Sequence, residues 1–266
     1  MNMPTKRLYT MASGFRRREF LKGALAASAF AAIPALSVFG KDKPKEVPAG
    51  ERVNLACVGI GNRGADVVSG LTATGLANVV ALCDVDMGAK HTQNVLKKFP
   101  KAPQFKDFRH MLEKMGREID AVSVGIPDHS HFPVAMLAMS MGKHVYVEKP
   151  MGHTFQEVEL MMAAEKKYKV CGQMGNQGHS GANYFQFKAW VEAGIIKNVT
   201  KIAAFMNSPR RWHGWKIGGF PKGEQIPATL DWDNWLATAR FHDYNKDYVN
   251  GQWRCWYDFG NGALGD

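Results

Sequence analysis

The sequence predicts an α/β fold in which a doubly wound parallel sheet is followed by a smaller second domain. Apolar runs typical of buried strands alternate with helical patterns between residues 53 and 177. These runs are continuously apolar, which is typical of parallel strands covered by helices on both faces. From about Gly181 the alternation stops, and tryptophan, glycine, aspartate and asparagine become frequent. We therefore expect three segments, at 1–45, 46–180 and 181–266.

The elements of the middle segment follow from these periodicities. Each expected strand is an apolar run of eight or nine residues bounded by turn residues, and a helical pattern separates successive runs. Strands are expected at 53–60, 78–86, 119–126, 143–150 and 170–177, and helices at 65–74, 87–99, 108–115, 130–142 and 154–169. A helix between strands is the usual connection that parallel pairing requires.

The last segment has a different pattern. It begins with an expected helix at 182–194 and an expected strand at 199–208. Residues 210–259 are loop-like and contain every tryptophan except Trp190. The chain ends at NGALGD, directly after an expected strand or turn. We expect this domain to be truncated, which would leave exposed apolar surface and an unpaired sheet edge.

The positive charge is concentrated at the N-terminus. The chain has a formal net charge of +10, of which residues 1–45 contribute +7. The remainder, at +3, gives no reason to expect a nucleic-acid partner. The sequence RREFLK at 17–22 is followed by an apolar stretch at 23–39 that is short for a membrane span. It resembles a twin-arginine export signal. We expect a periplasmic protein without stable membrane insertion once the signal is removed, and an N-terminal helical anchor is the alternative.

The run VNLACVGIGNRG places three glycines, Gly59, Gly61 and Gly64, between an expected strand and an expected helix. Backbone N–H groups at such a turn point toward an anion beside the positive end of the helix dipole. Asp84 lies twenty residues beyond Gly64 at the end of the second strand, where a carboxylate can accept both hydroxyls of an adenosine ribose. This combination predicts dinucleotide binding, with NAD favoured over NADP. Arg63 keeps NADP open, because a guanidinium can pair with a 2′-phosphate.

Polar sequences follow three later strands: GIPDHSH, VEKPM and GNQGHS. Parallel sheets bind ligands at the carboxyl ends of their strands. Lys149 in VEKPM suits proton transfer to or from a substrate hydroxyl beside a cationic nicotinamide. Taken alone, a surface lysine at a strand end is the simpler interpretation. The residues expected to bind the cofactor are Gly59, Gly61, Asn62, Arg63, Gly64, Asp84, Pro127, His131, Glu148, Lys149, Asn176 and Gln177.

No metal site is expected. Cys57 and Cys83 lie in apolar runs where cysteine behaves as a small hydrophobic residue, and none of the four cysteines forms a C-x-x-C pair. The histidines of the strand-end loops are spread over separate loops without a completing carboxylate; they are His129, His131, His153 and His179. For each of them a hydrogen-bonded loop histidine is the simpler interpretation.

The glycine turn, Asp84, PDHSH and especially GKHVYVEKP resemble the Gfo/Idh/MocA family of nicotinamide-dependent oxidoreductases over residues 52–266. The resemblance implies a Rossmann domain, then an α+β domain with a large, open and mainly antiparallel sheet. It further implies a cofactor held in the cleft, a sugar or polyol substrate, a cis peptide before Pro150, and pairing of subunits into a homo-oligomer. Lys149 would be catalytic near the reacting carbon. The family's D-x-x-x-H pattern assigns a second catalytic role to Asp266, with its histidine four residues later.

Substrate contacts are expected from the last segment. Trp212, Trp215, Trp253 and Trp256 could form stacking faces for a pyranose ring, with Arg254 and Asp258 hydrogen-bonding its hydroxyls and His179 nearby. Core packing explains each tryptophan equally well. Three functions stay open: hydride transfer with a sugar, glycoside or polyol hydroxyl, redox-neutral glycoside cleavage, and non-catalytic binding of nucleotide or sugar. The redox-driven glycosidase branch of the family usually lacks the lysine of E-K-P, which argues against the second.

Overall fold

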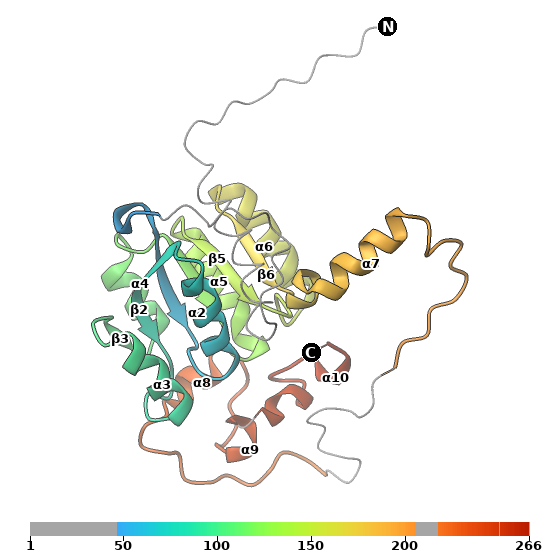
Figure 1. Cartoon of the computed structure of the whole chain (residues 1–266). Helices are drawn as coiled ribbons and strands as arrows, with labels where there is room; N and C mark the ends of the chain where they lie inside the picture. The colour runs from blue at the N-terminus through green and yellow to red at the C-terminus, as the bar shows by residue number, and fades with distance from the viewer. Residues whose placement is uncertain (1–46, 206–217, 250, 266) are drawn as a thin grey trace, which may run out of the picture.

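The computed structural model describes residues 47–205, 218–249 and 251–265. A central sheet is covered by helices on both faces, and residues 218–265 lie below it (Figure 1). The strands are β1 (Val53–Val58), β2 (Ala77–Cys83), β3 (Gln104–Phe105), β4 (Ala121–Val124), β5 (His144–Glu148) and β6 (Gly172–Gly175).

The six strands form one parallel sheet in the order β3-β2-β1-β4-β5-β6. This is the doubly wound order, whose direction reverses between β1 and β4. Val58 at the end of β1 is paired with Cys83 of β2 and with Val124 of β4. The loops after these three strands therefore emerge side by side. The five expected strands are confirmed, while β3, with two residues, was too short to be expected.

The helices divide the core into two layers. Apolar residues of α2 (Arg63–Ala73) and α3 (Lys90–Lys98) pack in one cluster, and those of α4 (Phe108–Met115), α5 (His131–Ser140) and α6 (Phe155–Tyr168) pack in another. Strands that are apolar on both faces need a layer of helices on each side to bury them. The Rossmann-like α/β fold expected from the sequence is confirmed.

The helix α7 (Ala182–Glu192) projects away from the sheet and has no buried residue (Figure 1). The strand expected at 199–208 is wrong over 199–205, which are irregular and exposed, while 206–208 lie outside the described residues. A lone segment cannot form a strand without a partner to complete its hydrogen bonds. Between residues 181 and 265 the described part of the chain contains no strand, so the open antiparallel sheet stays a prediction.

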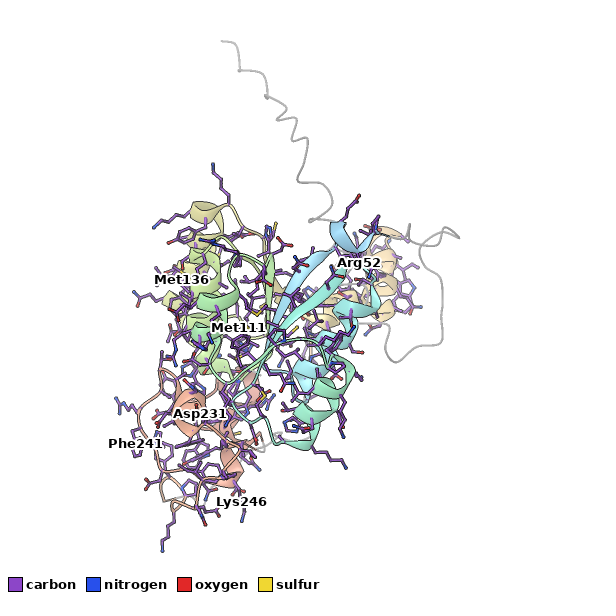
Figure 2. All side chains as sticks on the ribbon, turned by 90° about the vertical axis from the view of Figure 1, so that its left-hand side faces the viewer. Arg52, Met111, Met136, Asp231, Phe241 and Lys246 are labelled. Atoms are coloured by element: carbon purple, nitrogen blue, oxygen red, sulfur yellow. The ribbon has the colours of Figure 1, made fainter. Side chains whose placement is uncertain are left out.

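Residues 218–265 contain short helices, including α8 (Trp232–Leu236), α9 (Lys246–Val249) and α10 (Gly262–Gly265). Aromatic and aliphatic side chains form a third cluster here: Leu230, Trp232, Trp235, Leu236, Tyr244, Tyr248, Trp253 and Phe259. The tryptophans at 232, 235 and 253 are thus core residues of a packed segment. Figure 2 shows Asp231 on the side of this segment toward the sheet and Phe241 and Lys246 on its outer side.

Backbone contacts attach this segment to the carboxyl ends of the strands. Asp231 N donates to Val85 O at 2.8 Å, just beyond β2. The buried ring of His129 lies between two carbonyl oxygens, with Nδ1 3.1 Å from Phe259 O and Nε2 3.0 Å from Trp235 O. Segments far apart in the sequence therefore meet at the carboxyl ends of the strands, where ligands are expected. Among the helices of the described residues, none has both the length and the apolar character of a membrane span.

Candidate active site

A cleft of about 840 Å³ lies at the carboxyl ends of β1, β2, β4 and β5. The residues expected from the sequence that line it are Gly59, Gly61, Asn62, Arg63, Asp84, Pro127, Glu148, Lys149, Gln177, Trp253 and Arg254. One cavity thus brings together the glycine turn, the acid after β2 and the E-K-P lysine, which are far apart in the sequence. This is the position that the topology of a doubly wound sheet assigns to a ligand.

The glycines of this turn allow close contacts that a larger residue would block. Gly59 has φ +73°, a conformation that favours glycine, and a Cβ there would overlap Ile126 and lie 2.8 Å from the carbonyl carbon of Gly125. A Cβ on Gly64 would overlap Gly59 O and lie 2.7 Å from Gly59 C. Gly64 therefore lets α2 approach β1, and it faces inward instead of lining the cleft. At Gly61 the three heavy atoms nearest to a Cβ all belong to the side chain of His91.

The Asp84 carboxylate is held at the mouth of this turn. Its Oδ2 accepts a hydrogen bond from Ile60 N at 2.9 Å, and its Oδ1 accepts one from Asp86 N at 3.0 Å. Burial raises the pKa of Asp84, and the two N–H donors oppose that shift. The helix start, the glycine cradle and the carboxylate one strand over fit a dinucleotide. The helix start and the glycine cradle would hold its diphosphate, and the carboxylate would hold its adenosine ribose.

Arg63 turns toward the other end of the cleft. Its Nε lies 3.3 Å from Oε1 of Glu148, a carboxylate that is 6% exposed. Gln177 donates to the same oxygen at 2.6 Å. Burial raises the pKa of Glu148, and the Arg63 charge opposes this. Glu148 ends β5, and β1 and β4 separate this strand from β2, which Asp84 follows. The choice between NAD and NADP stays a prediction.

Lys149 lines the cleft at the end of β5, and the Lys149–Pro150 peptide is cis, as the resemblance implied. Beneath it lies His131, whose ring is 1% exposed and does not line the cleft. Both ring nitrogens face backbone carbonyls, so this residue supports the site from below. The structure differs from the expectation that His131 contacts the cofactor directly. The residue is buried, and both of its ring nitrogens face backbone carbonyls.

The residues expected to bind substrate separate into two groups. Trp253 and Arg254 line the cleft, with the guanidinium 4.2 Å from the centre of the Trp253 ring. Asp258 pairs with His242 at 2.7 Å outside the cleft.

His179 is exposed and stacks on Tyr184 at 5.1 Å, so it does not line the cleft. Asn176 does not line it either, because this residue lies in the turn between β6 and the following 3-10 helix (Gln177–Ser180). Asp266, Trp212 and Trp215 lie outside the described residues.

Several lining residues were not expected from the sequence. They are His91, Lys106, Phe108, Asp128, Asn234 and Trp235. Asn234 and Trp235 belong to α8, whose start carried a readable signal: Asp231 caps the helix by accepting from Asn234 N at 3.0 Å. The adjacent tryptophans and leucine at helical spacing complete that signal.

Cys83 is the cysteine that lines the cleft, and burial raises the pKa of its thiol. All four cysteines are free, and burial raises the pKa of the Cys57 thiol to about 12. Among the described residues, no group of three or more His, Cys, Asp or Glu side chains is placed to hold a metal ion.

A doubly wound sheet with a glycine turn at its switch point is typical of dinucleotide-binding domains, and residues 53–176 match the family model described as an oxidoreductase family with an NAD-binding Rossmann fold. Residues 181–266 match the C-terminal α/β domain of the same family. The chain belongs to the Gfo/Idh/MocA family of oxidoreductases.

Two curated relatives are glycosyl hydrolase family 109 proteins. The protein from Saccharopolyspora erythraea is 31% identical over 276 residues, which cover 94% of this chain and 52% of the relative. The protein from Shewanella amazonensis is 30% identical over 185 residues, which cover 62% of this chain and 40% of the relative. The chain thus spans about half of the length of these relatives, or less.

Solved structures of dehydrogenases are also similar. A dehydrogenase from Chromobacterium violaceum has a TM-score of 0.49 at 26% identity, covering 53% of this chain and 41% of that one. The WlbA dehydrogenase from Bordetella pertussis, solved with NADH and UDP-GlcNAcA, has a TM-score of 0.47 at 22% identity, covering 54% and 43%.

Proposed function

We propose that the complete natural protein transfers hydride between a nicotinamide cofactor and a hydroxyl-bearing carbon of a sugar, glycoside or polyol. The observation that carries the proposal is the single cleft that joins the glycine turn and Asp84 to Lys149 and a wall of Trp253 and Arg254. A bound nicotinamide dinucleotide would supply the hydride acceptor or donor. The residues that would hold it are the α2 N-terminus for the diphosphate and Asp84 for the ribose.

Lys149 would take the hydroxyl proton as the carbon is oxidised, or return it in the reverse direction. Lys149 is one of the residues that line the cleft. The Arg254 guanidinium on the Trp253 face provides donors for sugar hydroxyls beside an aromatic surface. Asp266 keeps its proposed catalytic role from the family pattern. In this scheme the protein supplies orientation and proton transfer, and water exclusion follows from the covering segment 218–265.

Redox-neutral glycoside cleavage is the second candidate, and the names of the curated relatives favour it. In this route a sugar carbon is oxidised, the glycosidic bond is eliminated, and the carbon is reduced again. The same cleft and the same hydride transfer serve both routes. The lysine of the E-K-P sequence is present here, which favours the first route over the second.

The test is to incubate the complete natural protein with NAD and a panel of sugars, polyols and aryl glycosides. Hydride transfer predicts net accumulation of NADH with at least one free sugar or polyol. Release of the aryl leaving group without net NADH supports the redox-neutral route instead. Tight nucleotide binding without either product supports a non-catalytic binding protein. Lys149→Ala is expected to lower turnover by about 10²–10⁴-fold, the usual contribution of a proton-transfer group, while cofactor binding persists.

We further propose that the cofactor is NAD, that the protein is exported to the periplasm by the twin-arginine route, and that it forms a homo-oligomer. An acid at Asp84 repels a 2′-phosphate, and the RREFLK sequence supports export. Replacing Arg17 and Arg18 together by lysine should leave the protein in the cytoplasmic fraction. Light scattering of the complete protein measures the oligomeric state.

A further inference from the structure

The two turns that border the lysine end of the cleft lie beyond the hydrogen-bond ladder of their strands. The ladder of β4 ends at Val124 and that of β5 ends at Glu148. The carbonyls of Ile126 and Pro150 therefore have no strand partner in these registers. Leaving a carbonyl buried without a donor costs about 1–3 kcal/mol, so such groups normally find one. Here the ring nitrogens of a single side chain lie against both carbonyls.

That side chain is His131, the first residue of α5. Its Nδ1 lies 2.6 Å from Pro150 O, and its Nε2 lies 2.8 Å from Ile126 O. The ring is 1% exposed, so water does not compete for either nitrogen. It joins the turn after β4 to the turn after β5 in one span. Pro150 directly follows Lys149, so the ring is one residue from the proposed proton-transfer group.

The protonation state limits what the ring can donate. Burial lowers the pKa of His131 to about 4, with the charges of His129 and Lys149 contributing in the same direction. Near neutral pH the ring is neutral and has one N–H. The shorter contact is to Pro150 O, which favours the N–H on Nδ1. In that tautomer Pro150 O accepts the ring N–H, and the unprotonated Nε2 lies against Ile126 O without donating to it.

We propose that His131 is a positioning residue that fixes the Lys149–Pro150 turn against the turn after β4. This inference rests on the proposed role of Lys149. Proton transfer requires heavy atoms about 2.6–3.2 Å apart. A displacement of about 1 Å can reduce turnover by about 10²-fold. A ring that ties down the residue next to Lys149 controls that displacement without contacting the substrate.

Two substitutions separate the two contacts. His131→Asn places an amide N–H near the position of Nδ1 and keeps a donor for Pro150 O. His131→Gln reaches toward the position of Nε2 and moves the donor from Pro150 O to Ile126 O. The matched control is His144→Gln at the other end of β5, where His144 Nδ1 accepts from Cys171 N at 2.9 Å. The control removes a comparable histidine-to-backbone bond far from Lys149.

The first readout is the rate at which acetic anhydride acylates Lys149 as a function of pH, measured by peptide mass spectrometry on protein without cofactor. It needs no substrate, so it does not depend on the proposed reaction. The Gln variant is expected to change this rate relative to the other lysines, while the Asn variant and the His144 control match the wild type. The melting temperature of each variant measures the purely structural cost.

The second readout is steady-state turnover of the complete natural protein. His131→Gln should lower kcat by about 10–100-fold, with KM and the Kd for NADH changed by less than about twofold, because only the position of the lysine moves. Unchanged acylation in the Gln variant, or losses that follow melting temperature alone in all three variants, would overturn the inference. If the Gln variant does not fold, altered acylation in the Asn variant contradicts it and wild-type acylation supports it. If no carbohydrate turns over, the proposed function fails, and the acylation result still decides whether His131 sets the environment of Lys149.

Discussion

The glycine turn gives a prediction in which stability and cofactor binding separate. In Gly64→Ala the new Cβ would overlap Gly59 O and lie 2.7 Å from Gly59 C, and both are backbone atoms. Ordinary contact begins at 3.4 Å, so α2 must move away from β1. Overpacking of this kind costs about 1–3 kcal/mol. In a domain of 150–250 residues each kcal/mol lowers Tm by about 2–4 °C, so we expect a decrease of roughly 2–12 °C.

Gly61→Ala is the matched control for this substitution. The three heavy atoms nearest to its Cβ belong to the side chain of His91, which is exposed and can turn aside. We expect its Tm to stay within about 2 °C of the wild type, since the cost stays near 0.5 kcal/mol. A methyl group at this position blocks close approach of a diphosphate to the backbone, so NADH affinity should fall.

Differential scanning fluorimetry without cofactor measures the Tm values, and fluorescence titration with NADH measures affinity. The reasoning is refuted if Gly64→Ala melts at the wild-type temperature. It is equally refuted if Gly61→Ala melts as low as Gly64→Ala, or if it binds NADH as tightly as the wild type.

Three further predictions follow from the site. Arg63→Ala should weaken NADH binding without changing the ratio of NAD to NADP affinity, because the guanidinium faces Glu148; a selective loss of NADP binding in parallel titrations would contradict this. Because the pKa of His131 falls from 6.5 to about 4 on folding, the unfolded chain binds an extra proton below pH 6.5, and stability should decrease by about 3 kcal/mol as the pH falls from 7 to 4. Urea unfolding across this range should show a shallower pH dependence for His131→Asn, and parallel curves would count against the assignment. Trp253→Phe should raise KM for the sugar while leaving the Kd for NADH unchanged, and the reverse pattern would remove Trp253 from the substrate wall.

The Rossmann-like part of the chain was predictable because its signals are local. Continuous apolar runs and the helices between them are set by neighbouring residues, and the glycine turn with Asp84 follows directly from that order. The strand ends then place Lys149 beside the glycine turn without any further information. β3 escaped prediction because two residues carry no periodicity.

The covering segment and the supporting contacts were not predictable in the same way. α8 and its neighbours are short, and their tryptophans pack against one another and against Val85 through long-range contacts. His131 shows the limit most clearly. Its place after PDHS suggested a ligand contact, yet its ring nitrogens face the backbone carbonyls of Ile126 and Pro150. Local sequence does not report which backbone groups a fold will leave without partners.

The most direct test of the central claim is calorimetric titration of the protein with NAD and with NADP, alongside Asp84→Asn. The account predicts saturable binding of a nicotinamide dinucleotide. It also predicts a loss of about 10–100-fold in NAD affinity for the variant, since a hydrogen bond to a charged group is worth about 1.5–3 kcal/mol. Binding of neither nucleotide by the wild type, or equal NAD affinity in the wild type and Asp84→Asn, would contradict it.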